Sequence, residues 1–192
     1  MIMSAQSADS KRLHPHKFTL WVGIGAIIMM FAALTSAYVV RHAQQNWFEF
    51  DLPKVFWYST AVIIASSVTM HFSLKAFVAH NRLRYRLLLG ITALLGVLFA
   101  VLQITGFYNL YSRGIQIIGE GSNPSASFLG IITGLHVVHV LGGVIALLII
   151  YIKAFSTRIK TYDSIPIEIL SVYWHFVDIL WIYLFIFLNL AR

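Results

Sequence analysis

Residues 128–152 are FLGIITGLHVVHVLGGVIALLIIYI, a stretch without Asp, Glu, Lys or Arg. The hydrocarbon core of a bilayer is about 30 Å thick, so a helix that rises about 1.5 Å per residue needs about 20 apolar residues to cross it. Four other stretches also meet this requirement: 18–40, 55–78, 87–108 and 170–190. Backbone groups in lipid must pair within their own segment, and these runs lack the alternation of barrel strands. Each stretch is therefore predicted to be a transmembrane helix.

The predicted fold is an all-α integral membrane protein, with residues 1–192 forming a single membrane domain of five helices. The composition agrees, because 59% of the 192 residues are hydrophobic and only 11% are charged. Soluble domains usually have about 45–50% apolar and about 25% charged residues. Cysteine is absent, which excludes disulfides, thiolate metal sites, covalently attached c-type haem and the copper-bearing subunit of an oxidase.

The net charge of +7 reflects basic residues in the short connections between the apolar stretches, not a nucleic-acid surface. One side of the membrane receives Lys11, Arg12, Lys17, Lys75, Arg82, Arg84, Arg86, Lys153, Arg158 and Lys160. The other side receives Arg41, Lys54, Arg113 and Arg192. The positive-inside rule then predicts a multi-pass protein of the bacterial cytoplasmic membrane, with its N-terminus in the cytoplasm and its C-terminus outside.

Two histidines, His136 and His139, share one face of the helix at 128–152. Ligation of haem or metal is one interpretation, but two histidines one turn apart cannot bind opposite faces of one haem. Hydrogen bonding to neighbouring helices is favoured, since Gly134, Gly142 and Gly143 permit close approach.

His175 and Asp178 have the same spacing on the last helix. A proton relay is the functional interpretation, although no other predicted helix contains a carboxylate to continue it. Structural pairing of the two side chains is favoured, because an aspartate in lipid is either neutral or paired with a cation. Counting about 1.5 Å per residue places His139 and Asp178 about 17 and 18 Å from the outer face. We therefore also expect a bond between His139 and Asp178.

The helix at 55–78 contains a polar patch of Ser66, Ser67, Thr69, His71 and Ser73. Small hydroxyl residues more often join helices than line a pore, so packing is the favoured role of this patch and of Gln103. Arg82, Arg84 and Arg86 are expected to bind anionic lipid headgroups.

The run YWHFVDILW at 173–181 closely resembles the final-helix signature of subunit III of the haem–copper oxidases, the cytochrome c oxidase type. The run GLHVVHVLGG at 134–143 resembles the preceding helix of that family. Weaker likenesses are Leu52-Pro53, Ser59-Thr60, Ser66-Ser67, Asn81-Arg82 and Leu102-Gln103. Order and spacing match from about Lys17 to the C-terminus, as in the short five-helix members.

The resemblance implies an accessory subunit of a proton-pumping cytochrome c oxidase in aerobic respiratory electron transport. It implies a chain that packs against subunit I, binds phospholipid and has no catalytic or metal-binding residue, because haem and copper belong to subunits I and II. Subunits I and II, and a subunit IV where present, are the implied partners. His71, Gln103, His136, His139, Trp174, His175 and Asp178 are implied structural residues of the family motifs, and Lys153 a lipid contact.

One departure from the family concerns two acidic residues: a glutamate that many members carry in the first of these helices, and a second family acid after the Leu-Gln pair. Their positions fall near Ile27 and at Gly106 in this chain. Any role of those carboxylates in proton handling therefore cannot be transferred.

Three alternatives stay open. The nearest is a subunit III-like protein of a quinol oxidase or nitric oxide reductase. A haem-b anchor that exchanges electrons with quinone would use the histidines as ligands, and a small transporter would need inverted repeats, which the sequence lacks. The sequence also leaves open the electron donor, the haem type and any supercomplex with a quinol–cytochrome c reductase.

Overall fold

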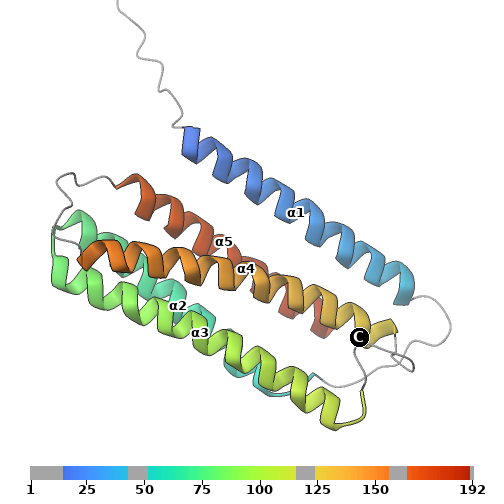
Figure 1. Cartoon of the computed structure of the whole chain (residues 1–192). Helices are drawn as coiled ribbons and strands as arrows, with labels where there is room; N and C mark the ends of the chain where they lie inside the picture. The colour runs from blue at the N-terminus through green and yellow to red at the C-terminus, as the bar shows by residue number, and fades with distance from the viewer. Residues whose placement is uncertain (1–14, 43–51, 116–123, 156–163, 191–192) are drawn as a thin grey trace, which may run out of the picture.

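The computed structural model describes residues 15–42, 52–115, 124–155 and 164–190. These ranges contain five helices (Figure 1): α1 Pro15–His42, α2 Val55–Val78, α3 Arg82–Ser112, α4 Pro124–Phe155 and α5 Ile165–Leu190. All five are long and apolar enough to cross a membrane. The prediction of an all-helical chain with five long apolar helices is confirmed.

Several helices continue past the apolar stretches that predict them. α3 covers 82–112, where 87–108 was predicted, and α4 covers 124–155, where 128–152 was predicted. The residues at the starts of α3 and α4 help to explain why these helices begin earlier than predicted. The Asn81 side chain accepts a hydrogen bond from the Arg84 backbone N–H at 3.2 Å. Pro124 is the first residue of α4, where its missing N–H has no helical partner to lose.

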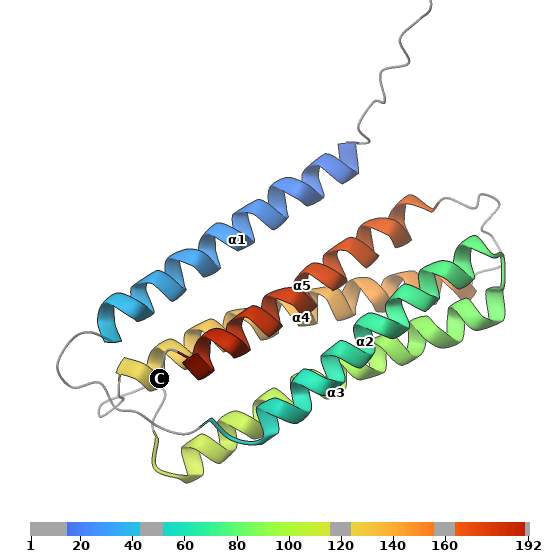
Figure 2. The same ribbon diagram turned by 180° about the vertical axis from the view of Figure 1, so that it is seen from behind.

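The helices are arranged in three layers. Figures 1 and 2 show α1 on one side, the antiparallel pair α2 and α3 on the other, and α4 with α5 between them. Among the described residues α1 contacts only α4 and α5. On the other side, α2 packs on α5, and α3 packs along α4 and also contacts α5 through Gly96 and Phe99. The connection between α2 and α3 is short, with His80 in the left-handed region at φ 56°, so the two helices fold back along each other.

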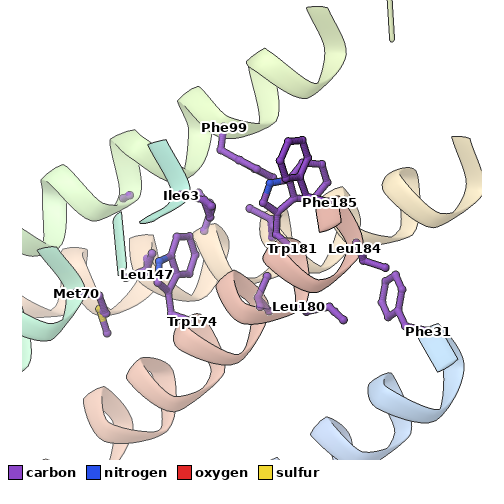
Figure 3. Close-up of a cluster of buried hydrophobic side chains, with 14 of the residues drawn as sticks. Phe31, Ile63, Met70, Phe99, Leu147, Trp174, Leu180, Trp181, Leu184 and Phe185 are labelled. Carbon is purple, nitrogen blue, oxygen red and sulfur yellow. The ribbon is translucent and has the colours of Figure 1, made fainter. Parts of the chain in front are cut away.

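The core of the bundle is built around two tryptophans of α5, Trp174 and Trp181, which are both about 1% exposed (Figure 3). Glycines make room for the first of them. A methyl group at Gly96 of α3 would lie 2.7 Å from the Trp174 ring, and one at Gly143 of α4 would lie 3.0 Å from it. Gly96 and Gly143 thus form a groove for the Trp174 ring, which we call the glycine groove. This contact fixes the rotation of α5 about its own axis.

Candidate functional site

Three side chains of α5 form hydrogen bonds with three hydroxyls of α2. The Trp174 indole N–H donates to Ser66 Oγ at 2.9 Å, and the Trp181 indole N–H donates to Thr60 Oγ1 at 3.0 Å. His175 Nδ1 lies 2.6 Å from Ser67 Oγ. We call these six residues the α2–α5 seam. The seam shows what Ser66 and Ser67 of the polar patch do, since small hydroxyl residues are effective contacts between membrane helices.

A second set of polar contacts joins α2 to α3. Gln103 Nε2 donates to Ser59 Oγ at 3.0 Å, and both side chains are fully buried. The hydroxyls of Thr69 and Thr92 lie 2.8 Å apart. Thr69 of the polar patch and Gln103 therefore make the packing contacts that the sequence favours for them.

The two histidines of α4 have different surroundings. His136 is fully buried, with its ring stacked on Trp181 at 5.1 Å between centroids and in edge contact with Phe99 at 5.8 Å. His139 is partly buried, and its Nδ1 donates to Leu135 O of its own helix at 2.7 Å. The expected imidazole hydrogen bonds to neighbouring helices are not formed within the described ranges, because aromatic rings surround His136.

The predicted pairing of His175 with Asp178 is wrong, because His175 bonds to Ser67 instead. Asp178 is 2% exposed, and neither carboxylate oxygen has a hydrogen-bond partner among the residues that the structure describes. The expected bond between Asp178 and His139 is also absent.

Helix geometry explains why Asp178 misses His139. The Tyr173 hydroxyl donates to His139 O at 3.0 Å, so Tyr173 marks the side of α5 that faces α4. Asp178 follows five residues later, which places it about 140° further around the helix at about 100° per residue. The carboxyl of Asp178 therefore lies on a different side of α5 from Tyr173 and His139. The rotation of α5 about its axis, which residue counting does not supply, therefore separates the two groups.

His71 is exposed on α2, and its ring lies 6.4 Å from the ring of His175. Nowhere in the described parts of the chain do three His, Asp or Glu side chains gather in a way that could hold a metal ion.

The basic residues divide into two kinds. Arg86 Nε donates to Ala154 O at 2.8 Å, and its guanidinium lies 4.5 Å from the centroid of the Phe155 ring. Arg86 thus joins the start of α3 to the end of α4, an internal contact that the expected lipid role did not include. Arg82, Arg84 and Lys153 are exposed.

Sequence reasoning missed two contacts at the ends of helices. One is the Arg86 contact, for which the sequence gives no signal, because the acceptor is a backbone carbonyl. The other is the ion pair between Lys17 of α1 and Glu168 of α5, with 2.9 Å between Nζ and Oε2. The sequence did hold a signal for this pair, because Glu168 is the only acid in the first turn of α5 and lies on the same predicted side as Lys17.

Comparison with known proteins extends these observations. A family model described as "Cytochrome c oxidase subunit III" matches residues 49–190, which include all of α2 to α5. A "Probable cytochrome c oxidase subunit 3" of Nocardia farcinica is 33% identical over 198 aligned residues, covering 97% of this chain and 96% of the relative. A "Cytochrome c oxidase subunit 3" of Corynebacterium diphtheriae is 31% identical, covering 86% of this chain and 85% of the relative. That of Bacillus sp. (strain PS3) is 26% identical, covering 86% and 80%.

Proposed function

Because the chain belongs to the cytochrome c oxidase subunit III family, we propose that it is the accessory subunit III of a proton-pumping cytochrome c oxidase. The observation that carries the proposal is the family match over residues 49–190. This range includes every residue of the α2–α5 seam, so all three bonds of the seam lie in the matched part. The complex would pass electrons from cytochrome c to oxygen through haem and copper centres in subunits I and II.

In this proposal the chain contributes packing and no redox centre of its own. Its indoles, hydroxyls and amides bond to each other across helices, which gives a rigid wall against which subunit I can pack. The surroundings of His136 support this view, since Trp181 and Phe99 lie against its ring where a haem would need space. The motif residues His71, Gln103, His139, Trp174, His175 and Asp178 would then be structural.

We place the ends of α2 and α4 and the start of α3 in the cytoplasm of a bacterial cell, in its inner membrane. These ends lie together in Figures 1 and 2, and they hold the exposed Lys75, Arg82, Arg84 and Lys153. A cluster of exposed cations at one end of a bundle follows the positive-inside rule and suits anionic phospholipid headgroups. Bound phospholipid at this end is part of the proposal.

Purification through a tag on the chain, in mild detergent, tests this function. We expect subunits I and II to co-purify, with an a-type haem spectrum and oxygen uptake driven by reduced cytochrome c. An untagged strain carried through the same purification is the control. Uptake driven only by quinol would assign the chain to a quinol oxidase, and nitric oxide reduction would assign it to a nitric oxide reductase.

A chain that emerges alone with its own b-type haem would contradict the proposal outright. In that case His136 or His139 would be a ligand. Co-purification of a quinol–cytochrome c reductase with the oxidase would extend the proposal to a respiratory supercomplex.

A further inference from the structure

Thr133 differs from the other threonines whose hydrogen bonds are resolved in the helices. The hydroxyls of Thr19, Thr35, Thr60, Thr69, Thr92 and Thr105 each donate to a carbonyl three or four residues earlier in their own helix. This internal bond is the common arrangement for a helical threonine. Thr133 is 1% exposed, and its Oγ1 has no hydrogen-bond partner among the described residues. Its hydroxyl therefore forgoes the usual bond although water outside the bundle cannot reach it.

Other polar atoms without partners lie close to Thr133 in the fold. His136 follows it by three residues on the same face of α4, and neither ring nitrogen has a partner in the described part of the chain. On α3, the amide of Gln103 donates to Ser59 through Nε2, but its Oε1 has no partner there either.

The register of α3 and α4 brings these three side chains to one region. The rings of Phe99 and His136 are 5.8 Å apart, which fixes a point of contact between the two antiparallel helices. Gln103 lies about one turn beyond Phe99 along α3. Thr133 lies about one turn before His136 along antiparallel α4, which is the same direction in space. Gln103, Thr133 and His136 thus lie within about one or two helical turns of the contact between Phe99 and His136.

We propose that this region binds ordered water between α3 and α4, held by Thr133, His136 and Gln103. A buried polar group without a partner is strongly unfavourable, and buried polar groups in proteins are nearly always bonded to protein or water. The chemistry of the three side chains fits water. Gln103 Oε1 and the unprotonated nitrogen of His136 accept hydrogen bonds, while the Thr133 hydroxyl and the imidazole N–H donate them. Water both donates and accepts, and buried water typically makes two to four such bonds.

A neutral ligand is favoured over an ion because these three side chains include no carboxylate. Asp178 is also buried, but it belongs to α5 and not to the two helices that carry this set of side chains. Trp181 and Phe99 pack against the His136 ring, so a molecule as small as water suits this region better than a larger polar molecule.

A high-resolution cryo-electron microscopy map of the assembled complex tests the proposal directly. We expect density about 2.7–3.2 Å from Thr133 Oγ1 and from a ring nitrogen of His136. An empty region in a map that resolves other internal waters would overturn it. So would a Thr133 hydroxyl bonded to the carbonyl of Leu129 in that map.

The variant Thr133→Val provides a second test that depends on the sign of the effect. If the hydroxyl binds water, we expect its removal to lower the thermal midpoint at which the chain leaves the assembled complex. If the region is dry, replacing an unbonded hydroxyl by a methyl group of similar shape would raise that midpoint, which would contradict the proposal. Thr92→Val is the matched control, because its buried hydroxyl is bonded to Leu88 and Thr69 and its loss should lower the midpoint in either case.

Discussion

Helices α1 and α5 are both long and apolar enough to cross a bilayer, but they are built into the molecule very differently. Half of the most apolar segment of α5 is buried, against 17% of the corresponding segment of α1. α5 is joined to α2 by the three bonds of the seam and is held in rotation by the glycine groove. α1 contacts the rest of the described chain at scattered points, such as the 3.2 Å contact between the hydroxyls of Thr35 and Tyr183.

The comparison shows that hydropathy identifies a membrane helix but does not reveal its neighbours. The indole groups of α5 lie opposite hydroxyl groups of α2, so protein is the preferred environment of α5. α1 leaves Trp21 and Met29 well exposed, so most of its surface is suited to lipid or to another subunit.

The largest expected difference is between two tryptophans. Trp174→Ala removes a fully buried ring and its bond to Ser66, so we expect a loss of about 3–5 kcal/mol in the free energy of unfolding of the chain. Trp21→Ala on α1 changes a side chain that is 63% exposed, and we expect a change within about 0.5 kcal/mol. Pulse proteolysis of the tagged chain in the purified complex measures both. Similar losses for the two variants would show that a partner covers Trp21 as completely as the bundle covers Trp174.

A smaller difference is expected between two glycines. Gly96→Ala places a methyl group 2.7 Å from the Trp174 ring and 2.8 Å from Val144, so the overpacked core should be destabilised by about 1–3 kcal/mol. Gly23→Ala on α1 has no atom within 4 Å of the new methyl group in the structure. We expect that variant to be at least as stable as the unaltered protein under the same proteolysis, because alanine favours a helix interior over glycine. A defect in Gly23→Ala would reveal close packing of α1 against another subunit.

The individual bonds of the seam should be weaker still. Ser66→Ala removes the acceptor of the Trp174 indole, and bonds of this kind between membrane helices contribute about 0.6 kcal/mol on average and at most about 1.7 kcal/mol. The exposed Ser36 of α1 provides the control variant Ser36→Ala. A double-mutant cycle with Trp174→Phe isolates the bond. Zero coupling between Ser66 and Trp174 would mean that shape alone positions α5.

The sequence was sufficient to predict the five helices, because a long apolar run in lipid must satisfy its backbone hydrogen bonds within itself, as a helix does. It also predicted the packing role of Ser66 and Ser67. The sequence did not predict that Trp174 and His175 of α5 bond to these two serines. His175 and Asp178 are close enough along the helix to pair, but Trp174 in the glycine groove turns His175 towards Ser67 instead.

Rotation about the helix axis is the quantity that the sequence did not supply. Depth in the membrane follows from counting residues, so His139 and Asp178 were expected at similar levels. Their separation depends on how α5 is turned against α4, and that turn is set by packing against Gly96 and Gly143. The functional roles of the motif histidines stay predictions, as does lipid binding by Arg82, Arg84 and Lys153.

The smallest expected effect concerns the ion pair that joins α1 to α5. Lys17 and Glu168 are 43% and 37% exposed, so solvent and headgroups screen their attraction. A double-mutant cycle of Lys17→Met and Glu168→Gln should give a coupling of about 0.2–1 kcal/mol, which decreases as salt is raised. Coupling well above that range, unaffected by salt, would show that the pair is enclosed in the assembled complex. α1 would then be fixed at its start as firmly as α5 is along its length, and the contrast between the two helices would hold only for the isolated chain.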